Sequence, residues 1–469
     1  MLRYFRINDP YRLLGLFGLL VLLCLPLFID TPDTTFPELK SFLVGEKVAE
    51  GFGLYHEVID STPPFASWFY GSCDFILGRS LTARHITAFL LLFAQSIFIG
   101  VMFIDKRVFP ENTYIPTLIF SLLTLLSFDV LSLTADLAAF GFLLLALNAL
   151  LTEIEFRVQR DETIFTLGLF ISFATLFNFS YTIYLPGVFL ILIIFTRNNV
   201  RKHLLLLIGF ILPHLIICSV YYIHGHLDDL WSRFYLSGFS FASPSLISFK
   251  SLIALASVPI AFLFISIFIL NRDARLTKYQ SQLLQTMFLW FMVALIQIYF
   301  TPDLRPQSLL PLAPAVCFFF THFLLLIRRR KFAEINIWIL LIGIVSTLYL
   351  ARYSKLQSID YSRLFVTPSS YSIMNKKVLM LDDNLDVFLQ NTVSPSFIEW
   401  SLIKEIFDAP QYYENVLLVN RLLEKDSPQV IVDPENRMEK FFTRLPKLKN
   451  QYTKSPEGHW ILTEKRISN

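Results

Sequence analysis

Long apolar runs alternate with short polar stretches along the first three quarters of the chain. A helix needs about 20 apolar residues to cross a membrane upright, and eleven runs approach that length. The predicted spans lie near residues 11–30, 84–104, 113–128, 136–152, 163–178, 182–196, 203–223, 250–270, 282–300, 308–327 and 335–351. Several of them are short, so the pairs within 113–152 and 163–196 could instead form tight hairpins on the outer side.

The loops between these runs differ sharply in their content of basic residues. Six of them are rich in Lys and Arg: Arg3/Arg6/Arg12, Lys106/Arg107, Arg157/Arg160, Arg197/Arg201/Lys202, Arg272/Arg275/Lys278 and Arg328/Arg329/Arg330/Lys331. Because Lys and Arg collect in cytoplasmic loops, these six are expected inside. We therefore predict a multi-pass protein of an inner or cytoplasmic membrane, with its N-terminus inside and its C-terminus outside.

This orientation leaves three sizeable regions outside the membrane: residues 31–83, 224–249 and everything after about 352. In loop 31–83, the segment Glu38–Glu50 spaces apolar residues as an amphipathic surface helix does. Pro63-Pro64 then starts a second apolar segment, Phe65–Leu77, whose aromatic residues suit the membrane interface. The short loop 301–307 is also predicted to lie outside.

The composition changes after the last span. Residues 353–469 are polar and charged, and short apolar stretches within them alternate with helical patterns. Lys377–Leu381, Gln429–Val432 and Trp460–Leu462 are predicted strands, and Ser396–Phe407 is a predicted helix. We therefore predict two domains: a transmembrane domain over residues 1–352 and a small extracytoplasmic α/β domain over residues 353–469.

The overall composition supports a polytopic α-helical membrane protein and argues against nucleic-acid binding. Of 469 residues, 54% are hydrophobic and only 16% are charged, and the mean hydropathy is +0.56. The net charge of +3 comes mainly from the basic loops, so nucleic acid is not an expected partner. The four cysteines are scattered without metal-site or disulfide spacing. No cofactor is predicted, and the need for a divalent metal stays open because isolated acids do not define a coordination shell.

Acidic residues on the predicted outer side are candidates for chemistry. Loop 31–83 and the residue before it contain Asp30, Asp33, Glu38, Glu57 and Asp60, and the fourth span begins at Asp136. An ionisable residue at the mouth of a span is costly unless it is used or paired. Two carboxylates from separate outer elements suit acid–base chemistry on an acceptor hydroxyl. Asp136 could equally cap its own helix, since Asp is favoured there.

Basic residues on the outer side are few. Arg84 and Arg305 both lie at an outer boundary, where either could bind a lipid-linked phosphate. Interfacial snorkelling or pairing with nearby acids is the alternative. The pair His224/His226 is a weak metal-site candidate, and Asn178-Phe179-Ser180 matches a glycosylation sequon at a span edge.

The first outer loop carries the most specific resemblance. It resembles the corresponding loop of GT-C glycosyltransferases of the dolichyl-phosphate-mannose mannosyltransferase and aminoarabinose-transferase type, through Glu38, Gly51, Leu54-Tyr55, Asp60 and Pro63-Pro64. Asp136 resembles the second acidic position of that family, and Arg305 with Pro311 and Pro314 resembles its late segment at the lipid phosphate. This chain has Pro37 where the family has a leading Asp, and Pro306-Gln307 follow Arg305 instead of the usual His-Tyr.

The resemblance implies transfer of a sugar from a polyprenyl-phosphate-linked donor to an acceptor on the outer face. It implies a catalytic role for Glu38, Asp33 or Asp136, and contacts to the donor from Arg305, Arg84, Tyr55 and Asp60. Membrane lipid and envelope proteins, the latter through the C-terminal domain, are further expected partners. The absence of the leading Asp leaves a second hypothesis open: a non-catalytic membrane scaffold of GT-C type in a cell-envelope complex.

Overall fold

The computed structural model describes residues 1–155, 160–195, 200–239, 245–273, 276–367, 371–455 and 458–463. Among the loop arginines, Arg157, Arg197 and Arg275 lie outside this part of the chain. The described residues form two compact units. The first contains Met1–Pro32, Ser80–Val220 and Ser240–Leu364, and the second contains Asp33–Arg79, Tyr221–Phe239 and Phe365–Asn469.

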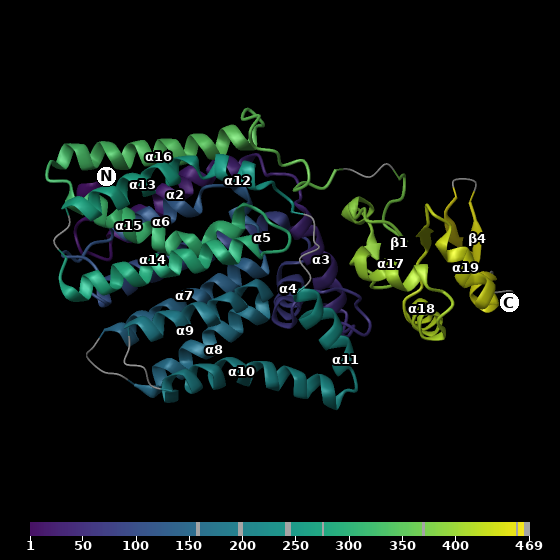
Figure 1. The fold of residues 1–469 in the computed structure, drawn as a ribbon. Coiled ribbons are helices and arrows are strands. Elements are labelled where there is room, and N and C mark those ends of the chain that lie inside the picture. The colour runs from purple at the N-terminus through teal and green to yellow at the C-terminus, as the bar shows by residue number, and fades with distance from the viewer. Residues whose placement is uncertain are drawn as a thin grey trace. The chain divides into compact units, whose positions relative to one another are not determined.

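The first unit is built from helices (Figure 1). The α-helices are α1 (Leu2–Phe5), α2 (Arg12–Ile29), α5 (Leu81–Asp105), α6 (Ile115–Thr124), α7 (Ala135–Ile154), α8 (Asp161–Phe177), α9 (Tyr184–Phe195), α10 (Val200–Ile223), α12 (Phe249–Leu255), α13 (Ser257–Asp273), α14 (Lys278–Tyr299), α15 (Ala313–Leu326) and α16 (Arg330–Arg352). Three short 3₁₀ helices precede α7, α9 and α15: η1 (Phe128–Leu131), η2 (Phe179–Ile183) and η4 (Pro306–Leu312).

All eleven predicted spans coincide with helical segments, but eleven crossings are not confirmed. Among the described residues, seven helices are long and apolar enough to cross a membrane. An eighth crossing is possible if α12 and α13, bent by 66° against each other, form one broken span. The remaining predicted spans correspond to α6, α8 and the pair η2–α9, none of which reaches 18 residues. The hydrophobic pattern thus located the helices but not the number of crossings.

The second unit begins with two packed helices, α3 (Phe36–Ala49) and α4 (Pro64–Leu77). They belong to residues 31–83, which we call the first outer loop after the side of the membrane predicted for it. Both were predicted from the sequence. Two glycines permit their close approach: a Cβ at Gly45 would lie 2.6 Å from the Tyr70 carbonyl oxygen, and one at Gly71 would lie 2.9 Å from Val48. The same unit contains α11 (Leu227–Leu230) and a π-helical stretch, Trp231–Leu236.

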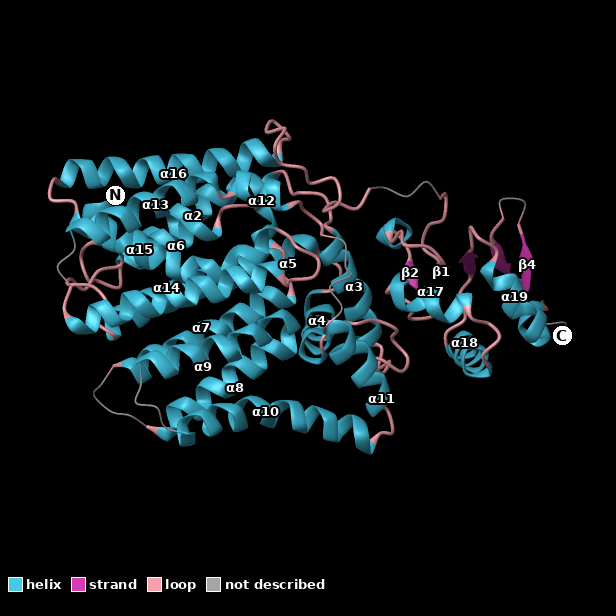
Figure 2. Cartoon of the chain, viewed as in Figure 1, coloured by secondary structure: helices cyan, strands magenta, loops and turns pink. Residues whose placement is uncertain are grey.

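The C-terminal part of this unit is the predicted α/β structure, and Figure 2 shows its strands. Five strands, β1 (Lys377–Met380), β2 (Thr392–Val393), β3 (Val430–Val432), β4 (Tyr452–Lys454) and β5 (Trp460–Leu462), form a sheet in the order β2-β1-β3-β5-β4. β1 pairs in parallel with β2 and β3, whereas β5 pairs antiparallel with β3 and β4. The helices are α17 (Trp400–Asp408), α18 (Tyr413–Lys425), α19 (Arg437–Arg444) and α20 (Pro446–Lys449).

The first outer loop and the C-terminal part share one core. Ile59 is fully buried in the same apolar cluster as Leu379, Phe397 and Phe407. Its backbone N–H donates to the Ser396 carbonyl over 2.8 Å. The side chain of Lys47, only 1% exposed, lies 2.9 Å from the Asp426 carboxylate. A buried charge persists only when it is paired, so this contact ties α3 firmly to the C-terminal part.

Candidate functional site

A buried polar network surrounds the start of α7 in the first unit. Thr134 is the N-cap residue and has an extended backbone, so Asp136 stands in the first helical turn instead of at the cap. The expectation that Asp136 caps this helix is therefore wrong. A carboxylate in the first turn is stabilised by the helix dipole and by the nearby backbone N–H groups.

Arg305, 169 positions further along the chain, contacts Asp136. It is the N-cap residue of η4, which Pro306 begins, and its backbone is extended. The guanidinium forms an ion pair with Asp136 and donates a hydrogen bond of 3.0 Å to the Thr134 hydroxyl. The two side chains are only 7% and 15% exposed, so water screens this pair weakly.

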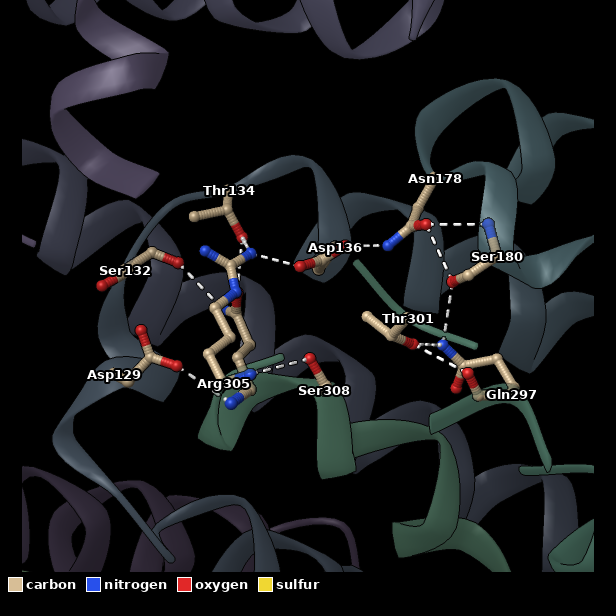
Figure 3. Close-up of polar contacts among 11 residues, drawn as sticks. Asp129, Ser132, Thr134, Asp136, Asn178, Ser180, Gln297, Thr301, Arg305 and Ser308 are labelled. Carbon is tan, nitrogen blue, oxygen red and sulfur yellow. Dashed lines mark hydrogen bonds and ion pairs between the residues drawn. The ribbon is translucent and has the colours of Figure 1, made fainter. Parts of the chain in front are cut away.

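The second oxygen of Asp136 is also occupied. The Asn178 amide donates to it, and Figure 3 shows Asp136 between this amide and the Arg305 guanidinium. The Asn178 carbonyl oxygen accepts from the Ser180 hydroxyl over 2.8 Å. The Gln297 amide in turn donates to Ser180 and to Thr301, over 2.9 and 2.7 Å. Asn178 and Arg305, from two distant segments of the chain, thus contact the two oxygens of one carboxylate.

Gln307 connects the Arg305 segment to the loop before α7. Its backbone N–H donates to the Asp129 carboxylate over 2.9 Å, and its side-chain amide donates to the Ser132 carbonyl over 3.0 Å. Its side-chain oxygen accepts from the Thr134 hydroxyl. Since that hydroxyl gives its proton to Gln307, its oxygen is left to accept from Arg305. Gln307 therefore orients the Thr134 hydroxyl so that its oxygen accepts from the guanidinium.

The acids of the first outer loop belong to the second unit. Glu38 is buried, and one of its carboxylate oxygens accepts from the Thr35 N–H over 2.9 Å and from the Thr35 hydroxyl over 2.8 Å. Thr35 and Glu38 thus form a capping box at the start of α3. Asp33 is exposed, and within the described residues no hydrogen bond or ion pair holds its side chain.

Tyr55 and Asp60 both contact the backbone at Thr62. The Tyr55 hydroxyl donates to the Thr62 carbonyl over 2.8 Å, and an Asp60 oxygen accepts from the Thr62 N–H over 2.7 Å. Tyr55 adopts a φ of 74°, which is rare for an aromatic residue. Both side chains are fully buried, and they hold the turn that leads into α4.

A lysine joins Asp60 to the C-terminal part of the second unit. The Lys40 ammonium lies 3.2 Å from both the Asp60 and the Glu399 carboxylates. Burial raises the pKa of Asp60, against the opposing effect of Lys40. Burial would raise the pKa of Glu399 as well, but Lys40 and hydrogen bonds from Ser61 outweigh it and lower that pKa to about 2. Glu399 is therefore the ionised partner of Lys40 over the whole physiological range.

Arg84 and the pair His224/His226 were the other sequence candidates. Arg84 belongs to the first unit, is only 2% exposed and stands in the first turn of α5. His226 stacks on His56, with ring centroids 3.8 Å apart, and approaches Asp229 at 3.4 Å. Within the described ranges, no group of three or more His, Cys, Asp or Glu side chains could hold a metal ion.

Of the predicted site residues, the structure brings Asp136 and Arg305 together and joins Tyr55 and Asp60 through Thr62. Sequence reasoning missed Gln307, Gln297, Thr134, Lys40 and Glu399. It treated Asn178 as part of a sequon, whereas its amide donates to Asp136. The one available signal was the placement of Gln307 two residues after Arg305, where the family pattern differs.

Comparisons with known proteins agree with this architecture. No protein-family model and no curated protein matches the chain. The structure of ArnT from Cupriavidus metallidurans bound to undecaprenyl phosphate matches 92% of this chain and 88% of its own length, with 15% identity and a TM-score of 0.51. Its apo structure has the same coverage and identity and a TM-score of 0.50.

The archaeal oligosaccharyltransferase AglB from Archaeoglobus fulgidus, in complex with an inhibitory peptide and a dolichol-phosphate, has a TM-score of 0.49 at 11% identity. The match covers 98% of this chain and 75% of the AglB chain. At such identities a match reports the fold and not the activity. The chain is an integral, multi-pass membrane protein with the fold of the GT-C membrane glycosyltransferases.

Proposed function

We propose that this protein transfers a sugar from a polyprenyl-phosphate-linked donor to a hydroxyl acceptor on the outer face of the membrane. The observation that carries the proposal is the buried Arg305 at the centre of a fixed polar network, in a fold shared with ArnT. Arg305 would hold the phosphate of the donor, because a guanidinium matches phosphate oxygens in charge and geometry.

The reaction requires one new bond and one broken bond. The acceptor oxygen bonds to the anomeric carbon of the sugar, and the bond between that carbon and the phosphate oxygen breaks. The electron pair of that bond leaves with the polyprenyl phosphate, whose growing negative charge Arg305 stabilises. The acceptor proton passes to a carboxylate acting as general base.

Three carboxylates are candidates for that base. Asp33 is exposed and has no partner among the described residues, so it can receive a proton without breaking an existing contact. Glu38 would have to loosen its hydrogen bonds to Thr35. Asp136 would have to give up its ion pair with Arg305. Of the three, only Asp136 belongs to the same unit as Arg305, whereas Asp33 and Glu38 belong to the second unit.

The experiment measures undecaprenyl phosphate released from undecaprenyl-phosphate sugars by the full chain reconstituted in lipid. We expect Arg305→Gln to lower the rate by about 100-fold, as loss of a charge-stabilising group does in other enzymes. Glu153→Gln serves as a control, because it removes the carboxylate of another buried ion pair, with Lys202. Unchanged release in all three of Asp33→Asn, Glu38→Gln and Asp136→Asn would contradict the proposed chemistry.

A second candidate function is a non-catalytic scaffold of the same fold in a cell-envelope complex. Two observations favour it: Pro37 stands where the family has an acid, and the neighbouring Glu38 is used to cap α3. A phenotype that persists in Asp33→Asn, Glu38→Gln and Asp136→Asn, and that is lost on disruption of the C-terminal part, would support the scaffold over the transferase.

A further inference from the structure

The carboxylate of Asp136 neutralises the cation that the proposed function assigns to the lipid phosphate. One oxygen of Asp136 pairs with Arg305, and the other accepts from Asn178. Carboxylate and phosphate oxygens are alternative ligands for the same guanidinium donors. A phosphate that approaches Arg305 therefore meets a cation whose charge an internal anion already balances.

We propose that Asp136 competes with the lipid phosphate for Arg305, an inference that rests on the proposed function. The ion pair of the resting protein opens when a polyprenyl phosphate binds and closes again when it leaves. Its closure lowers the affinity for the released polyprenyl phosphate and so favours product release. The role of Asp136 is then to regulate the strength of the phosphate site.

The hydrogen bonds around the pair allow it to open without disturbing the fold. On one side, Thr134 holds the guanidinium at 3.0 Å, and Gln307 fixes Thr134. On the other side, Asn178 holds Asp136 and is itself fixed by Ser180. Each charged group thus keeps a second, independent partner when the contact between the two is broken. Such an arrangement favours a small separation over local unfolding.

Competition for Arg305 and a simple orienting role predict opposite changes in the affinity for undecaprenyl phosphate when Asp136 is replaced. If Asp136 competes for Arg305, Asp136→Asn frees the cation and tightens binding of undecaprenyl phosphate, by about tenfold for a change of 1.4 kcal/mol. If Asp136 only orients the guanidinium, the same variant loosens binding. Thr134→Val removes a hydrogen bond from Arg305 without changing charge, and it is expected to weaken binding in either case.

The experiment measures the Kd of undecaprenyl phosphate for the full-length protein in lipid nanodiscs. Wild type, Asp136→Asn, Arg305→Gln and Thr134→Val are compared, and thermal unfolding checks that each is folded. Undecaprenol tests whether the phosphate is needed, and inorganic phosphate as a competitor distinguishes the lipid headgroup from the free ion. Glu153→Gln removes a buried carboxylate elsewhere in the first unit and controls for the change in net charge.

The inference is supported if Asp136→Asn binds about tenfold more tightly, Glu153→Gln is unchanged and Arg305→Gln loses at least about tenfold in affinity. Weaker or equal binding in a folded Asp136→Asn protein overturns the inference and leaves the proposed function standing. Unchanged binding in Arg305→Gln overturns both, because the phosphate would then bind elsewhere. Equal tightening by Glu153→Gln overturns the inference too, because the gain would follow net charge.

Discussion

Replacing Gln307 by leucine tests whether the network around Arg305 is held together as described. The Gln307 side chain is 1% exposed and makes two hydrogen bonds, one to the Ser132 carbonyl and one from the Thr134 hydroxyl. Leucine has a similar volume but neither donates nor accepts. Both partners are themselves buried, so the substitution leaves a carbonyl and a hydroxyl without their partner.

The magnitude follows from those two lost bonds. Each buried polar group that loses its partner costs about 1–3 kcal/mol, so Gln307→Leu is expected to lower the free energy of unfolding by about 2–6 kcal/mol. Gln95 provides a matched control. It is also buried, at 5% exposure, but its side-chain amide donates one hydrogen bond, to the Leu137 carbonyl within α7. Gln95→Leu, which leaves one buried carbonyl without this partner, should therefore cost about 1–3 kcal/mol.

The assay is thermal unfolding of the purified full chain in one detergent, alongside the Kd for undecaprenyl phosphate. Gln307→Leu should also weaken phosphate binding. Without the Gln307 oxygen, the Thr134 hydroxyl has no fixed acceptor for its proton, so its oxygen is no longer held in position to accept from Arg305. Gln95→Leu should leave the Kd unchanged. The account of the network is refuted if Gln307→Leu is no less stable than Gln95→Leu, or if both variants bind the lipid as wild type does.

Three further outcomes are expected in the second unit, each measured by thermal unfolding of the full chain. Lys47→Met leaves the buried Asp426 carboxylate without one of its cations and should lower the free energy of unfolding by about 3 kcal/mol. Lys425→Met removes an exposed ion pair and should lower it by less than about 1 kcal/mol. Equal losses of stability in the two variants would contradict the importance of burial. Gly45→Ala places a Cβ 2.6 Å from a carbonyl of α4 and should cost about 1–3 kcal/mol, while Gly18→Ala meets open space and should not destabilise. Because the pKa of Glu399 falls from 4.5 to about 2 on folding, its ionised form stabilises the protein by about 3 kcal/mol above pH 4.5, and this contribution is lost as the pH falls toward 2. The stability difference between wild type and Glu399→Gln should accordingly shrink in acid, and a constant difference would refute the assignment.

The hydrophobic pattern was sufficient to locate the helices of the first unit and several strands of the second. Helices α3 and α4 and strands β1, β3 and β5 all fall where periodicity and turn residues predict them. Strands β2 (Thr392–Val393) and β4 (Tyr452–Lys454) were missed because, unlike β3 and β5, they are not runs of apolar residues. The eleven predicted crossings are not confirmed, since apolar runs such as that of α6, with 10 residues, resemble spans in sequence alone.

The candidate site was only partly predictable, for a different reason. Charged residues stand out against an apolar background, so Asp136 and Arg305 could be selected from the sequence. Their pairing across 169 positions, and the amides that orient them, depend on tertiary packing. Asn178, Gln297 and Gln307 are neutral polar residues near span ends, and such residues have no pattern that distinguishes a partner from a solvated loop.

The departure at Pro37 has a local explanation in the start of α3. Thr35-Phe36-Pro37-Glu38 has the spacing of a capping box, and Pro37 lies in the first helical turn, where its missing N–H leaves no hydrogen bond unmade. Glu38→Gln keeps a side-chain oxygen that can accept from Thr35, so it should preserve the helix while removing a carboxylate. Thr35→Ala instead removes the cap, at about 1 kcal/mol, and keeps that carboxylate. Loss of sugar transfer in Glu38→Gln but not in Thr35→Ala would therefore assign Glu38 to the chemistry, and the reverse result would assign it to the fold alone.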